Sequence, residues 1–134
     1  METIGRTEEY HKRMGIDVKK DIDLSNGALN DHRIRVIADE LFKFKRCLDS
    51  EDACASLEYI TNIYVELNST MLLLGMGDYK EAAFNAVHEA NMTKLDDKGR
   101  PVIANDGRIA ETGNYIAPSM QTVIQTIKKE RKQQ

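Results

Sequence analysis

The sequence predicts an all-α protein, for two reasons. Its 134 residues are 41% hydrophobic and 31% charged, but only 6% are aromatic and Trp is missing. This composition is more typical of helical proteins than of β-sandwiches. Apolar residues also recur at spacings of three and four, the helical period, in segments separated by glycines. A chain of this length suits one domain with its own core.

The first long helix is expected from Asp31 to Asp49. Asn30 or Asp31 is the expected N-cap, because short polar side chains accept hydrogen bonds from the first free amides of a helix. One apolar stripe follows the helical period and is expected to face the core. The stripe consists of Ile34, Ile37, Leu41, Phe44 and Leu48.

Two further helices complete the predicted core. One runs from about Asp52 to Leu74, is capped near Ser50 and ends at the glycines of 75–77. The next runs from about Tyr79 to Asn91, with Asp78 as its cap. Its inward residues are expected to be Ala83, Phe84 and Val87.

The remaining segments are shorter. Turn signals at Asp97-Lys98-Gly99 and Asp106-Gly107 predict a small hairpin or extended arm. A last helix is expected from about Pro118 to Lys132, and Glu8 to Met14 forms a short one. The predicted domain therefore has four parts: an N-terminal arm (1–30), a helical core (31–95), a hairpin or loop (96–117) and a C-terminal helix (118–134).

Charge and cysteine content exclude several classes of protein. The net charge of −3 disfavours a DNA or RNA polymer as a partner, because duplex binding requires many basic side chains. Cys47 and Cys54 form no C-x-x-C pair, so neither a zinc site nor a disulfide framework is indicated. No apolar run approaches membrane-spanning length and no signal peptide is evident. We therefore expect a cytoplasmic protein without a membrane partner.

Two motifs carry a family resemblance. The segment 84–95 reads FNAVHEANMTKL, and 10–16 reads YHKRMGI. With the order of the predicted helices, they resemble the MazG-like all-α nucleoside-triphosphate pyrophosphatases, to which phosphoribosyl-ATP pyrophosphatase is similar. The resemblance covers nearly the whole chain and implies a MazG-like helical bundle with Asn91 and Lys94 beside a bound nucleotide. Further nucleotide-binding candidates are Lys43, Arg108 and Tyr115.

The resemblance also implies a metal site, which this sequence only partly retains. Active members carry E-x-x-E on one helix and E-x-x-D on the next, and these carboxylates bind Mg²⁺ or Mn²⁺ against the triphosphate. The matching positions here are Glu40 with Lys43, and Glu58 with Thr61. Two of the four carboxylates are replaced, one of them by a cation, so metal binding is disfavoured. If the alignment is shifted, Asp39, Asn62 or Glu66 would be substitute ligands.

Three functions stay open. The chain binds a nucleotide or nucleotide-derived signal with hydrolysis lost or weak, as a sequestering protein of phage origin would. Alternatively, it is an active metal-dependent pyrophosphohydrolase that gives a nucleoside monophosphate and pyrophosphate, or a helical protein-interaction module. Each candidate residue also has an alternative role without function. Asn91 would cap a helix, and Lys94, Glu40 and Glu58 would be ordinary exposed side chains. A homodimer or homotetramer is expected, because three or four helices of this length cannot by themselves enclose a nucleoside triphosphate.

Overall fold

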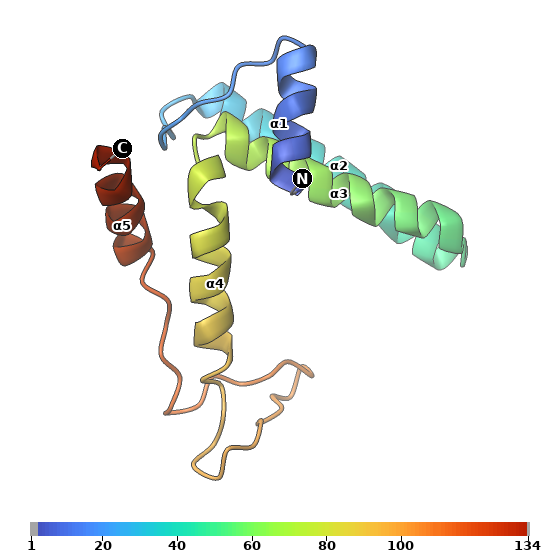
Figure 1. The fold of residues 1–134 in the computed structure, drawn as a ribbon. Helices are drawn as coiled ribbons and strands as arrows, with labels where there is room; N and C mark the ends of the chain where they lie inside the picture. Colours follow the sequence, from blue (N-terminus) through green and yellow to red (C-terminus); the bar gives the residue numbers. More distant parts are fainter. Residues whose placement is uncertain (1–2, 134) are drawn as a thin grey trace. The chain divides into compact units, whose positions relative to one another are not determined.

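The structure is a computed structural model that describes residues 3–133 (Figure 1). Within this range the chain is all-α and contains no β-strand, as the composition predicts. Two compact units divide the chain, one ending at Gly77 and the other beginning at Asp78. The single-domain organisation stays a prediction. The helices are α1 (Thr3–Arg13), α2 (Gly27–Asp49), α3 (Ala53–Leu73), the 3-10 helix η1 (Gly77–Tyr79), α4 (Lys80–Asn91) and α5 (Met120–Lys132).

The long helices α2 and α3 form an antiparallel hairpin in the first unit (Figure 1). The predicted caps at Asn30 or Asp31 are wrong, because Asn26 accepts the hydrogen bond from the amide of Leu29 and α2 begins four residues earlier. Ser50 does not cap α3 either; Asp52 does, and it accepts from the amide of Ala55.

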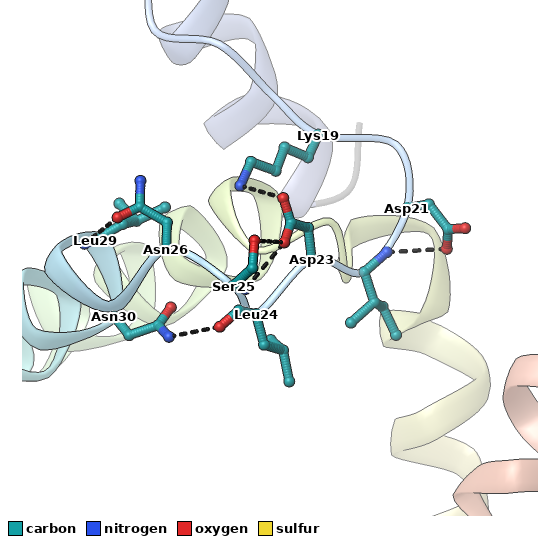
Figure 2. A network of polar contacts seen from close by, with 9 residues as sticks. Lys19, Asp21, Asp23, Leu24, Ser25, Asn26, Leu29 and Asn30 are labelled. Carbon is teal, nitrogen blue, oxygen red and sulfur yellow. Dashed lines mark hydrogen bonds and ion pairs between the residues drawn. The ribbon is translucent and has the colours of Figure 1, made fainter.

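A polar turn leads the chain into α2 (Figure 2). The Asp23 carboxylate accepts hydrogen bonds from the hydroxyl and the amide of Ser25 and from the Lys19 ammonium. These bonds to Ser25, and then those to Lys19, lower the pKa of Asp23 to about 2. The Asn30 side chain donates to the carbonyl of Leu24, so the turn and the first turn of α2 are joined.

The short helix α1 packs on α3 (Figure 1). It is longer than the predicted Glu8–Met14 segment and begins at Thr3, whose hydroxyl lies 2.9 Å from that of Tyr64. Near its other end, His11 Nε2 lies 2.9 Å from Ser69 Oγ, and both residues are buried. The contact between α1 and α3 is therefore polar at both ends.

A buried arginine joins α2 to α3. Arg33 Nε donates to Thr70 Oγ1 at 3.0 Å, and Nη2 donates to the carbonyl and the carboxylate of Glu66. Only 7% of Arg33 is exposed. We call the five side chains that join α1, α2 and α3 the polar junction: His11, Arg33, Glu66, Ser69 and Thr70.

The predicted core-facing stripe of α2 is exposed in the single chain, so that prediction is wrong at three of its five positions. Ile34, Leu41 and Leu48 are 67%, 55% and 49% exposed. Consecutive helical residues project about 100° apart, so burying Arg33 against α3 turns Ile34 about a quarter of the way round the helix. On α3, the apolar residues Leu57 and Ile60, which were expected on one side of the helix, are also exposed.

In the second unit, α4 and α5 pack together (Figure 1). The prediction that Asp78 caps α4 is wrong. Asp78 instead forms an ion pair with Arg131 of α5 at 2.8 Å. The same guanidinium donates to the Tyr79 hydroxyl and lies 5.0 Å from the centre of its ring. These contacts join the two ends of the unit. The predicted inward residues Phe84 and Val87 are exposed.

The predicted hairpin is reduced to one isolated antiparallel bridge between Ile103 and Ile109. Around it, the amide of Ala104 donates to the carbonyl of Arg108, and the amide of Ala110 donates to that of Val102. The rest of 92–119 is an extended arm and turns. No helix among residues 3–133 is long and apolar enough to cross a bilayer.

Candidate functional site

The candidate metal ligands lie on the hairpin of the first unit. Glu40 is on α2, with 20% of its side chain exposed, and its Oε1 atom lies 3.5 Å from the Lys43 ammonium. The other oxygen, Oε2, is buried and has no hydrogen-bond partner in the described part of the chain. The Lys43 ammonium therefore pairs with the carboxylate one turn before it.

On α3, the opposing positions are also poorly suited to a metal. Glu58 is exposed, and the Thr61 hydroxyl donates to the carbonyl of Leu57 in its own helix at 2.7 Å. The antiparallel register that joins Arg33 to Glu66 and Thr70 puts Glu40 level with about residues 59–63, so Glu40 and Glu58 lie on facing helices.

The substitute ligands do not complete this site. Glu66 is held by Arg33 in the polar junction, and Asp39 and Asn62 are exposed. Among residues 3–133, no three His, Cys, Asp or Glu side chains are grouped so as to hold a metal ion. Hard divalent cations need six or more oxygen ligands. Glu40 and Glu58 offer too few oxygen atoms for such an ion, and the Lys43 ammonium beside Glu40 repels a cation.

The second unit brings together two of the candidate nucleotide-binding residues. Lys94 Nζ lies 5.5 Å from the centre of the Tyr115 ring, and both residues are partly buried. A cation at this distance from an aromatic face is attracted by the ring quadrupole. The sequence alone could not predict this contact, because the two residues are separated by a long irregular segment.

Hydrogen bonds hold this pair in place. Thr93 Oγ1 accepts from the amide of Ile116 at 2.8 Å and donates to the carbonyl of Ala90 at 2.7 Å. Beyond it, the side chains of Thr112 and Asn114 both donate to the carbonyl of Leu95. The returning segment 112–116 is thus bonded along 93–95, which fixes Tyr115 beside Lys94.

Asn91 and Arg108 have different surroundings. Asn91 is the last residue of α4 and is exposed, while Met92 occupies the C-cap position, so the alternative of Asn91 as a helix cap is wrong. Arg108 is exposed on the arm and its Nε atom lies 3.1 Å from the Asp106 carboxylate. Its charge is therefore partly neutralised, and Arg108 is the weaker of the two candidates.

The second unit also contains a cavity of about 390 Å³, which the sequence did not predict. Its described wall includes Thr93 and Ile116, but neither Lys94 nor Tyr115. Its volume is in the range of small-molecule sites, and most of its lining is apolar. Ala86 and Ala90 lie one turn apart on α4, and their small side chains leave space for the cavity. This spacing of two alanines is the sequence feature that could have indicated it. Pro118, Ser119 and Val123 complete the opposite side.

No protein family and no curated protein matches this chain in sequence. The structure itself defines an all-α protein with a helical hairpin and a polar junction in the first unit, and a cation–aromatic pair and a cavity in the second.

Proposed function

We propose that this protein binds a nucleotide or a nucleotide-derived signalling molecule on a MazG-like fold, with hydrolysis lost or weak. The observation that carries the proposal is the contact of Lys94 with Tyr115 in the second unit, which also contains the cavity. The resemblance of the segment 84–95 to the MazG-like pyrophosphatases supports the same ligand class.

The chemistry of the pair suits a nucleotide. An ammonium binds phosphate oxygens through charge-assisted hydrogen bonds. The exposed side chain of Asn91 has both donor and acceptor atoms for a base, sugar or phosphate. The mostly apolar lining of the cavity in the second unit suits a flat ring, and stacking of a nucleobase on the Tyr115 ring would contribute about 1–3 kcal/mol. A phosphate-binding cation and a ring-binding wall therefore occur in the same unit.

The pairing of Lys43 with Glu40 on α2 supports the part of the proposal that concerns lost or weak hydrolysis. Family catalysis needs carboxylates that hold Mg²⁺ or Mn²⁺, and Lys43 already pairs with Glu40. Sequestration of a signal requires binding without turnover. A sponge protein of phage origin would need only the pocket, which is why we prefer this form of the proposal.

A binding test should separate the three functions. At a nucleotide concentration one hundred times its Kd, the protein should be stabilised by about 2.7 kcal/mol, because the ligand binds only the folded chain. Replacing Lys94 with alanine should weaken binding by about tenfold or more, the effect of a lost charge-assisted hydrogen bond. Thermal shift with a panel of nucleotides and titration calorimetry would measure both.

Lys98→Ala is the matched control, since Lys98 is an exposed lysine of the same segment. It should bind with the affinity of the unmodified chain. Mass spectrometry of small molecules released on denaturation would identify a ligand carried through purification. Stabilisation by no nucleotide, with no ligand released, would contradict the proposal and favour a protein-interaction module.

Hydrolysis is the second candidate, and one observation favours it. The buried Oε2 atom of Glu40 lacks a hydrogen-bond partner among the described residues, and buried carboxylate oxygens are usually satisfied. A ligand would supply that missing partner. Pyrophosphate release in Mg²⁺ or Mn²⁺ that disappears in Glu40→Gln would establish this function in place of simple binding.

We also propose that the chain is a homodimer or homotetramer. The exposed apolar stripe of α2 continues at heptad spacing, as does that of α3 through Leu57, Ile60, Tyr64 and Leu67. Two such hairpins would bury their stripes in a four-helix bundle. A glutamate at Leu41, in the middle of the α2 stripe, should convert the oligomer to a monomer that remains helical. Light scattering after size-exclusion chromatography would measure the mass.

Arg46→Glu is the control, because Arg46 is exposed on the side of α2 away from the stripe. It should leave the oligomer intact. An unmodified chain that is monomeric at micromolar concentration would contradict the proposed assembly.

A further inference from the structure

The imidazole of His11 is buried in a setting that favours its neutral form. His11 is 2% exposed, and the single described hydrogen bond of its ring is between Nε2 and the Ser69 hydroxyl at 2.9 Å. The other ring nitrogen, Nδ1, is buried and has no partner within residues 3–133. A neutral ring leaves one lone pair unsatisfied there. A protonated ring would bury an unsatisfied N–H and a positive charge, at a much larger cost.

The charges around His11 come from three helices. The positive charge of Arg33 on α2 disfavours protonation of the His11 ring, whereas the negative charges of Glu66 on α3 and Glu8 on α1 favour it. Glu66 is itself paired with Arg33, so its charge is largely compensated. Burial first, and then the Arg33 guanidinium, lower the pKa of His11 below its ordinary value near 6.5.

We propose that His11 is an acid-sensitive latch: the neutral imidazole holds α1 on α3, and proton uptake on Nδ1 releases α1 from the helical hairpin. The inner contact of α1 depends on this ring, since His11 and Thr7 are the buried residues of the helix. The outer contact, from Thr3 to Tyr64, is exposed and weak alone. Release would also remove the groove of about 290 Å³ between α1 and α3, which includes Thr7 and Tyr10.

The direction of the pH effect follows from linkage. Because the pKa of His11 is lower when α1 is docked, the released state binds the proton more tightly. Docking is therefore fully stable above about pH 6.5 and weakens as the pH falls from there towards the docked-state pKa. In that window the ratio of released to docked α1 rises by up to about tenfold per pH unit, because one proton is taken up.

The test is NMR on the full chain between pH 7.5 and pH 5. The ring of His11 should titrate below the ordinary imidazole pKa near 6.5. Amide protection of residues 3–13, corrected for intrinsic exchange, should fall over the same interval. In His11→Gln, which keeps a group able to bond to Ser69 but cannot titrate, that fall should be absent. His32→Gln is the matched control and should behave like the unmodified chain.

Two results would overturn the latch. One is protection of α1 that persists at a pH where His11 is already charged. The other is loss of protection in His11→Gln over the same pH interval as in the unmodified chain. If His11→Gln proves unstable, the unmodified chain still tests the latch, because protection of α1 must fall over the pH interval in which His11 takes up its proton.

Discussion

Alanine in place of Gly75 is expected to destabilise the first unit by at least about 3 kcal/mol. Gly75 has φ of +78°, where an L residue costs about 1–2 kcal/mol. Its added Cβ would lie 1.7 Å from the Asp21 carbonyl oxygen and 2.2 Å from the carbonyl carbon. These are backbone atoms, so no side-chain rotation relieves the overlap. Urea denaturation followed by circular dichroism would measure the loss.

The overlap occurs because the segment before α2 is bonded along the end of α3. The amide of Lys19 donates to the carbonyl of Leu72, and that of Asp23 donates to the carbonyl of Leu74. Gly15→Ala is the control, since Gly15 also has positive φ but an added Cβ meets no atom within 4 Å. It should cost only about 1–2 kcal/mol. Equal losses in the two variants would contradict the close approach at Gly75.

Replacing Arg33 with methionine should destabilise the hairpin by about 3 kcal/mol or more. The guanidinium is the partner of the Glu66 carboxylate and of Thr70 Oγ1, and its removal leaves a partly buried carboxylate without a counter-ion. Breaking such a pair typically costs about 3–5 kcal/mol. Because 29% of the Glu66 side chain is exposed, water offsets part of that loss and we expect the lower end.

A double variant separates the pair from the packing. With Arg33→Met and Glu66→Met together, no unpaired charge remains, so most of the lost stability should return. Lys45→Met is the surface control, because its ion pair with Asp49 is exposed and should contribute less than about 1 kcal/mol. If the double variant is less stable than Arg33→Met alone, the charge pair is not the source of the loss.

The positions of the helices were predictable because the signals for them are local. The helical period, the glycines at 75–77 and the polar residues before each helix indicated α2 to α5 with ends a few residues in error. The cap errors at α2 and α3 have a common cause: several Asn, Ser and Asp residues lie near the start of each helix, and only the surrounding bonds select one. Asp78 is an example, since its pairing with Arg131 outweighs capping of α4.

The candidate site was predictable only as a set of residue types. The sequence indicated Lys94 and Tyr115 separately, yet their contact depends on Thr93 and Thr112 bonding across an irregular segment. The cavity of the second unit also depends on α4 and α5 packing together. For the metal positions, the sequence indicated a lysine three residues after Glu40, and the structure adds the pairing of Lys43 with Glu40.

By itself, the sequence determined that the protein is helical, where each helix lies and which ionisable residues it carries, because these depend on residues close together in the chain. The tertiary structure decided which face of each helix is buried. It places Arg33 inside and Ile34 outside, and it encloses His11 between helices. The physical reason is that burial depends on contacts between distant segments, and a stripe of apolar residues does not specify whether it meets its own chain or another copy.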